Sequence, residues 1–154
     1  MPLLNRRLML ITTALAGLCS PCLSAAAADD TGAITHVLKA QFDRPDAPLV
    51  VRPVVVHGTH AVAGWQQGRR GGRALLQRDP HAHGGWAITL CAGDGLRQAS
   101  VLQQAGVPQR DAQALQAAVA QAEQRLPAVE RQRLSTFEGV MRVQGAHPPA
   151  SHPH

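Results

Sequence analysis

The sequence is poor in aromatic and acidic residues, and both shortages narrow the classes of protein it can encode. Its 154 residues include no tyrosine, two tryptophans and two phenylalanines, and 10 acidic side chains stand against 15 basic ones. Proteins that bind nucleic acids rely on stacking aromatics or on a clustered basic face. The basic residues here are spread along the chain, so we expect no nucleic-acid partner.

Long apolar runs are missing beyond the N-terminus, where the first 28 residues have the parts of a removable export signal. Arg6 and Arg7 precede an apolar stretch at 8–18, and small residues fill positions 24–28. The stretch is too short for a membrane span, which needs about 20 residues. The alternative is an uncleaved anchor, and a loose twin-arginine pattern leaves the Sec and Tat routes open. We expect a cleaved signal, a periplasmic or secreted product, and no membrane span in the mature chain.

Cysteine is scarce as well. Cleavage would leave Cys91 as the single cysteine, because Cys19 and Cys22 belong to the signal. One cysteine forms no internal disulfide, so in an oxidising compartment it is buried, metal-bound or paired with another chain. The residues after the signal suffice for one domain, which we place at 29–143. Residues 144–154, rich in proline and histidine, predict a disordered tail.

Hydrophobic spacing between the signal and the tail predicts one α+β domain. Alternating apolar residues separated by turn residues predict a four-stranded antiparallel meander with strands at 49–57, 61–67, 72–78 and 85–91. Helical spacing predicts one helix before the meander and others after it, at 31–43, 94–104, 109–126 and a short stretch after Pro127. Residues 137–143 fit a helix end or a fifth strand. An N-terminal helix, a meander and C-terminal helices are together compatible with a cystatin-like topology.

Three residues carry finer structural predictions. Pro53 favours an edge position for the first strand, because proline donates no hydrogen bond to a neighbouring strand. Asp94 is predicted to cap the helix that follows it. Pairing the strands through the shortest loops puts Cys91 on the face opposite the predicted core, near the turn at Arg69 and Arg70. That core consists of Trp65, Ala74, Leu76, Trp86, Ile88 and Leu90.

Four histidines lie in two of the predicted turns. His57 and His60 flank the two-residue turn Gly58-Thr59, so they pair directly across the hairpin, with Cβ atoms roughly 5 Å apart. His81 and His83 lie in the third turn, which a meander places at the same end of the sheet as the first. We call these four residues the histidine rim. Imidazoles suit Cu(II), Zn or Ni, and Cu(II) ranks highest in affinity, so the rim and Asp79 predict a metal site. The alternative is that they are solvated loop side chains.

Cys91 is a separate candidate site, because it is expected roughly 20 Å along the strand from the histidine rim. Near arginines its thiol would be activated as a thiolate. The alternative, which we favour, is a small buried hydrophobe. No serine–histidine–aspartate order, glutamate pair or HExxH motif is present. A small hydrolase using an open sheet face would need a convergent acid or base, so we predict that the protein is not an enzyme.

Two segments resemble a known family of small exported bacterial proteins, described as copper uptake system-associated proteins. They are residues 64–76, GWQQGRRGGRALL, and residues 86–96, WAITLCAGDGL. The alanine-rich helix that follows and the Phe137-Glu138-Gly139 segment are similar too, so the resemblance covers about residues 33–143. It rests on tryptophan, glycine and cysteine positions and brings no ligand set with it.

This resemblance implies a periplasmic accessory role in copper uptake, in which copper is bound, sensed, or passed to a transporter, receptor or chaperone. Cu(I) prefers a soft thiolate, so Cys91 becomes a stronger candidate, with a second ligand from another chain or protein. We therefore expect a non-enzymatic periplasmic protein that binds or relays copper ions. The alternative is an interaction module that binds no metal and docks another periplasmic copper-system protein.

Overall fold

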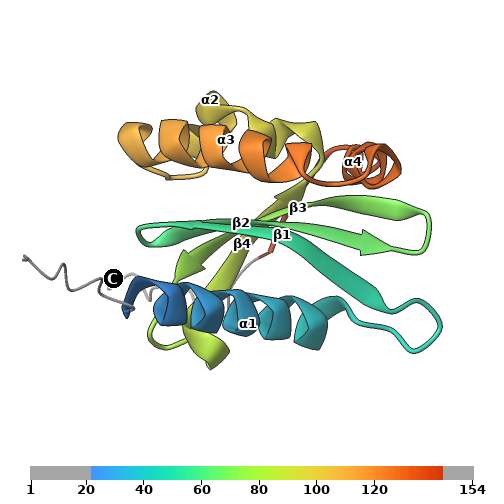
Figure 1. The fold of residues 1–154 in the computed structure, drawn as a ribbon, viewed down its shortest axis with the longest axis horizontal. Coiled ribbons are helices and arrows are strands. Elements are labelled where there is room, and N and C mark those ends of the chain that lie inside the picture. The colour runs from blue at the N-terminus through green and yellow to red at the C-terminus, as the bar shows by residue number, and fades with distance from the viewer. Residues whose placement is uncertain (1–21, 144–154) are drawn as a thin grey trace, which may run out of the picture.

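The computed structural model describes residues 22–143, which form three layers (Figure 1). The middle layer is a five-stranded antiparallel sheet in the order β1-β2-β3-β4-β5. Helix α1 (Cys22–Phe42) covers one face, and the other is covered by α2 (Ala99–Gln104), α3 (Gln109–Gln124) and α4 (Ala128–Leu134). No helix in this part of the chain is both long and apolar enough to cross a membrane.

The predicted meander is confirmed. Its strands are β1 (Leu49–His57), β2 (His60–Gln67), β3 (Arg70–Arg78) and β4 (Trp86–Ala92). β1 lies at an edge, as Pro53 predicts, and its pairing with β2 is interrupted between Val51 and Val54. A residue without an N–H fits such an interruption. The α+β class is therefore confirmed, whereas the cystatin-like topology stays a prediction.

The sheet has five strands rather than four. β5 (Val140–Arg142) pairs antiparallel with β4 at the opposite edge from β1. The sequence left this segment open between a helix end and a strand. The chain reaches β5 only after the three C-terminal helices, so the pairing joins segments that are distant in the sequence.

Helix α1 begins at Cys22 rather than at Thr31, so the predicted signal cleavage after residue 28 falls inside it. The rest of the predicted signal and the predicted tail lie outside the described residues. The part of α1 that follows the predicted cleavage point is attached to the sheet by Asp30. Its carboxylate accepts hydrogen bonds from Arg78 Nη2 at 2.7 Å and from Trp86 Nε1 at 3.3 Å. A chain starting at Asp29 would keep this attachment.

The predicted role of Asp94 as a helix cap is wrong. The predicted helix over 94–104 is divided into a 3₁₀ helix (Asp94–Arg97) and α2, because Gln98 between them has an extended backbone. Gly93 occupies the cap position of the 3₁₀ helix. The Asp94 carboxylate instead accepts a hydrogen bond from Ser135 Oγ at 2.7 Å, which connects it to the segment after α4.

The two faces of the sheet pack into separate hydrophobic cores. The core under α1 includes Ile34, Leu38, Ala63, Ala74, Leu76, Trp86, Ile88 and Cys91. The core under α2 and α3 includes Val62, Leu75, Leu90, Leu96, Leu102, Leu115 and Val119. Most of the predicted core face is therefore correct, but Leu90 and Cys91 have exchanged sides.

The prediction that Cys91 lies on the face opposite the tryptophans is wrong, because a bulge interrupts the β3–β4 pairing. Leu76 pairs with Ile88, whereas the preceding Leu75 pairs with Leu90, so Thr89 is an extra residue in β4. An extra residue reverses the alternation of side chains beyond it. The bulge therefore turns Cys91 towards α1, and the shortest-loop register could not anticipate it.

Arg73 connects β3 to the C-terminal helices. Its side chain is 1% exposed, and its Nε and Nη2 donate to the two carboxylate oxygens of Glu123 on α3 at 2.6 and 2.9 Å. Nη1 donates to the Leu134 carbonyl oxygen at 3.1 Å and to Asp94 at 3.2 Å. A buried charge is tolerated only when it is paired and hydrogen-bonded, and this side chain meets both conditions.

Replacing Glu123 with glutamine should destabilise the domain, because the buried Arg73 guanidinium would lose its buried opposite charge and keep only the exposed Asp94. Removing one partner of a buried ion pair costs about 3–5 kcal/mol, and urea denaturation should show a loss of that order in the free energy of unfolding. The control Glu138→Gln makes the same change at an exposed side chain and should have no measurable effect. Equal, small losses in both variants would contradict the role given to Arg73.

Candidate functional site

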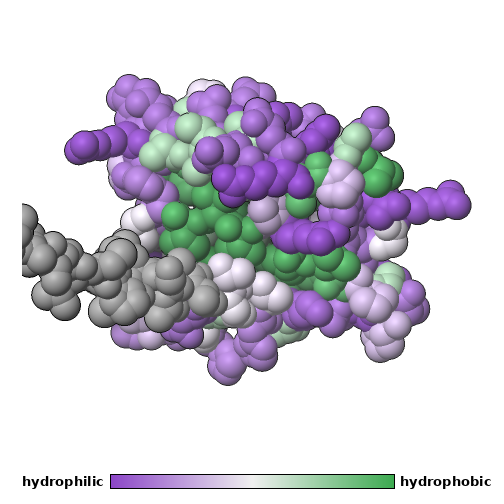
Figure 2. Space-filling view, in the orientation of Figure 1, coloured by the Kyte–Doolittle hydropathy of each residue, from purple (hydrophilic) through white to green (hydrophobic). Residues whose placement is uncertain are grey.

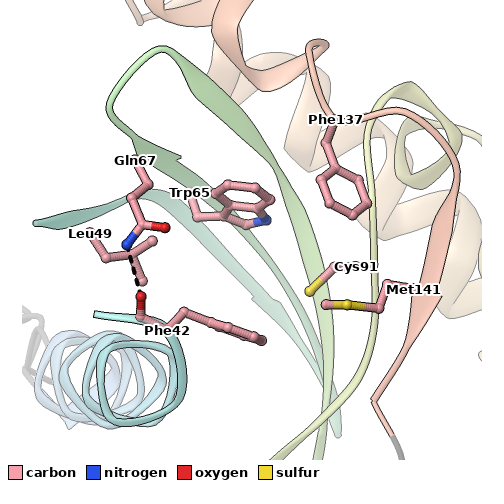
Figure 3. Close-up of a pocket in the computed structure, with 7 residues that line it drawn as sticks. All are labelled: Phe42, Leu49, Trp65, Gln67, Cys91, Phe137 and Met141. Carbon is pink, nitrogen blue, oxygen red and sulfur yellow. Dashed lines mark hydrogen bonds between the residues drawn. The ribbon is translucent and has the colours of Figure 1, made fainter. Parts of the chain in front are cut away.

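An apolar pocket of about 160 Å³ lies on the α1 side of the sheet, near the end of that helix (Figure 3). Residues from α1, β1, β2, β4, β5 and the segment before β5 line it: Phe42, Leu49, Trp65, Gln67, Cys91, Phe137 and Met141. In the space-filling view, apolar surface is gathered between the two helical layers, and the outer surfaces are mostly hydrophilic (Figure 2). The pocket therefore depends on tertiary packing, because no single element contains it.

Trp65 lies across β3 at its register partner Gly72. A Cβ at Gly72 would come within 2.9 Å of Trp65 Cζ2 and 2.8 Å of Phe137 Cβ, so glycine is required for this close approach. The Phe137 ring packs edge-on against the indole, with centroids 5.5 Å apart and planes at 75°. These contacts explain one glycine in the GGR sequence of the segment that resembles the copper-associated family.

The indole nitrogen of Trp65 is a buried donor without a hydrogen-bond partner among the described residues. Leaving such a donor unpaired costs about 1–3 kcal/mol. Figure 3 shows the nitrogen-bearing edge of the ring directed towards Cys91 and Phe137. The wall of the pocket therefore contains a polar group whose hydrogen-bonding capacity is unused among the described residues.

Phe137 is held in place by backbone contacts at the end of the sheet. Its N–H donates to the Gly71 carbonyl at 2.9 Å, and the Gly71 N–H donates to Thr136 Oγ1 at 2.9 Å. A Cβ at Gly93 would overlap the Phe137 carbonyl oxygen. The segment after α4 thus passes close to two glycines before it enters β5.

Cys91 and Met141 are direct register partners in the β4–β5 pairing. Directly paired residues of an antiparallel sheet share a face, and both side chains line the pocket (Figure 3). Cys91 is 2% exposed and Met141 is 42% exposed. One sulfur-containing side chain is therefore enclosed, and the other reaches the surface at the sheet edge.

Our sequence reasoning did not single out Met141 or Phe137. The sequence contained one indication of Met141. Met1 and Met9 fall in the predicted export signal, so Met141 is the only methionine of the mature chain. Cys91 and Met141 are then the only two sulfur-containing residues, and the fold places them side by side. Nothing in the local sequence indicated this pairing, since three helices separate β4 from β5.

The environment of Cys91 opposes the interpretation as an activated thiolate. Burial raises the pKa of the Cys91 thiol to about 11, since an apolar surrounding disfavours the charged form. The thiol is therefore protonated at neutral pH. This agrees with a small buried hydrophobe, and it means that a metal ion would have to displace a proton on binding.

Alkylation by iodoacetamide of the protein lacking residues 1–28, in which Cys91 is the single cysteine, should report this raised pKa. At pH 8 only about one thiol in a thousand would be ionised in the folded protein. The labelling rate should therefore still increase about tenfold per pH unit between pH 8 and 10. The control is the same protein unfolded in urea, in which the rate should level off above pH ~9, near the pKa of a free cysteine. A rate in the folded protein that levels off near neutral pH would contradict the raised pKa.

His57 and His60 pair directly across the β1–β2 turn, as predicted. Both lie on the α3 side of the sheet, where His57 Nε2 is 3.3 Å from Asp111 Oδ1 at the start of α3. His57 is exposed and His60 is buried. The nearby third turn is at the same end of the sheet, since the Arg78 N–H donates to the Thr59 carbonyl at 2.8 Å.

The histidine rim nevertheless divides between the two faces of the sheet. His83 lies on the α1 side, with its ring centroid 5.6 Å from that of His36, and His81 is exposed in the same turn. Between residues 22 and 143, no three side chains among histidine, cysteine, aspartate and glutamate are gathered where they could hold a metal ion. The four histidines thus do not converge on one point.

His60 should make the stability of the domain depend on pH. Burial lowers the pKa of His60, and the Asp111 carboxylate raises it in part. The unfolded chain therefore binds a proton more readily, so the free energy of unfolding should fall as the pH decreases below about 6.5. Denaturation in urea at several pH values should show this fall, and His60→Gln should reduce it. The control His81→Gln removes an exposed imidazole and should not. An unchanged pH profile in His60→Gln would refute the assignment.

No protein-family model matches the chain, and neither the curated proteins nor the solved structures contain a match. The resemblance to copper uptake system-associated proteins therefore stays a prediction.

Proposed function

We propose that this chain is an exported, periplasmic accessory protein of copper uptake, which binds Cu(I) at Cys91 and Met141 and relays it to another copper-handling protein. The observation that carries the proposal is the pairing of these two residues in one pocket. The resemblance of the two tryptophan-containing segments supports it independently. The proposal includes the signal over residues 1–28 and no enzymatic activity.

The chemistry of the two side chains suits Cu(I). Thiolate and thioether are the soft ligands that favour this ion over harder cations. The enclosed Cys91 would lose its proton to the solvent when copper binds, so affinity should increase with pH. Met141, which is 42% exposed, would be the ligand that a partner reaches first. The sequence predicted a second ligand from another chain or protein, and Met141 would provide one within the same chain.

The histidine rim is the second proposed place for copper, in the Cu(II) state. His57 and His60 lie opposite each other beside the Asp111 carboxylate, and imidazole and carboxylate are Cu(II) ligands. His81 and His83 would belong to a separate group on the α1 side. We rank this below the sulfur pair, because the four imidazoles are divided between two faces.

The alternative function is an interaction module that docks another periplasmic copper-system protein without binding metal. The protonated, buried thiol of Cys91 favours it. So does the edge strand β5, where Val140 is 60% exposed, since an edge strand with apolar residues is a surface on which partners bind.

Titration with Cu(I) against a competing chelator tests the proposal. The mature protein, without residues 1–28, should bind one equivalent, Cys91→Ser should abolish binding, and Met141→Leu should weaken it at least about tenfold, or ~1.4 kcal/mol. Val140→Leu, the neighbouring position on β5, is the control and should bind like the unchanged protein. Repeating the titration without residues 145–154 excludes the tail histidines.

Other outcomes would point elsewhere. If the protein binds Cu(II) and His57→Ala/His60→Ala removes that binding, the site lies at the first turn. If neither ion binds more tightly than it does to free histidine, the carrier function is wrong and the interaction module replaces it.

A further inference from the structure

A second hollow, of about 430 Å³, adjoins the apolar pocket, and Trp65, Gln67 and Phe137 line both. Its charge comes from Arg44, Arg69 and Arg70. Arg44 is paired with Asp46 at 2.7 Å. Arg69 and Arg70 are exposed and have no ion-pair partner within the part of the chain described here. Two guanidinium groups without an ion pair among the described residues therefore lie beside an apolar pocket, and Glu138 lines a further hollow with Arg70.

Two side chains that line the pocket carry nitrogen atoms that can donate a hydrogen bond, and only one of these nitrogens has partners in the described part of the chain. Gln67 Nε2 donates to the carbonyl oxygens of Phe42 and Ala47 at 2.8 and 2.9 Å. Trp65 Nε1–H is buried and has no partner among residues 22–143. Ligand pockets combine apolar walls with a few polar groups that fix the orientation of the ligand. The free indole N–H calls for an acceptor atom on such a ligand.

We propose that the pocket and the adjoining hollow form one binding site for a small organic carboxylate with a single ring or a short branched chain. The apolar part would lie in the pocket against the Trp65 and Phe137 side chains, and the carboxylate would face Arg69 and Arg70. A ligand oxygen would accept the hydrogen bond from Trp65 Nε1. The site goes beyond the copper proposal, since it requires neither sulfur atom.

The dimensions and the charge set the class of ligand. The pocket volume of about 160 Å³ is close to that of an engineered cavity of about 150 Å³ that binds benzene. It therefore accepts one ring and excludes a long acyl chain. Guanidinium groups bind carboxylates through paired, charge-assisted hydrogen bonds. A neutral compound of the same shape would fill the pocket without using the arginines.

The test compares phenylacetate with its neutral analogue phenylacetamide, by calorimetry on the full chain in the presence of a metal chelator. Phenylacetate should bind saturably and at least about tenfold more tightly than phenylacetamide. Arg69→Gln/Arg70→Gln should reduce phenylacetate binding to the level of the amide and leave the amide unchanged. The matched control Arg110→Gln/Arg125→Gln removes the same charge from exposed positions on and after α3, and should change neither affinity.

A further variant tests the role of the indole N–H. Trp65→Phe keeps an aromatic wall and removes the N–H, so it should weaken phenylacetate binding several-fold while the fold, checked by circular dichroism, is unchanged. The metal chelator keeps copper out of the pocket during this titration, which makes the result independent of copper. A failure of the copper titration would therefore not affect this test.

Three results would overturn the proposal. One is equal affinity for phenylacetate and phenylacetamide, which would leave the arginines without a role. Another is an equal loss in the two double-arginine variants, which would indicate net charge rather than a site. The third is the absence of saturable binding at millimolar phenylacetate in a folded protein.

Discussion

The buried ion pair between Arg73 and Glu123 is the constraint on which the rest of the structure depends. An arginine inside a core is stable only if every part of its guanidinium group is compensated. Here that requirement fixes α3 through Glu123 and the end of α4 through the Leu134 carbonyl oxygen. The chain that leaves α4 then crosses to the other face of the sheet, where Phe137 closes the pocket. An interaction on one side of the sheet thus positions a wall of the candidate site on the other.

The candidate site combines features that oppose each other energetically. Burial that shields Cys91 from solvent also keeps its thiol protonated, since the pKa is raised to about 11. A soft metal ion would offset the cost of deprotonation by binding the sulfur in place of the proton, whereas an alkylating reagent would not. Met141 at the exposed edge strand gives the same pocket an opening. The free indole N–H of Trp65 and the arginines of the β2–β3 turn add polar groups to the site. Binding of a metal ion through the two sulfur atoms would not use them.

Particular residues show how far the sequence could be interpreted. The abundance of valine predicted the first strand, Pro53 predicted its edge position, and the turn residues predicted the meander, because these effects are local. The pairing of His57 with His60 followed from a two-residue turn in the same way. The side of the sheet on which Cys91 lies could not be predicted in this way, because one bulge at Thr89 reverses the alternation of side chains. The histidine rim was predicted from the topology alone, which places the turns at one end but does not decide which face each side chain uses.

The sequence by itself determined the α+β class, the order of the first four strands and most of the core, because these follow from hydrophobic periodicity and turn chemistry over a few residues. Only the tertiary structure decided that Cys91 lies opposite Met141, that Trp65 rests on Gly72, and that Arg73 meets Glu123. Each of these contacts joins residues that are not neighbours along the chain. Such contacts depend on the exact register of strands and the seating of helices, which are set by packing and by the compensation of buried charge rather than by local pattern.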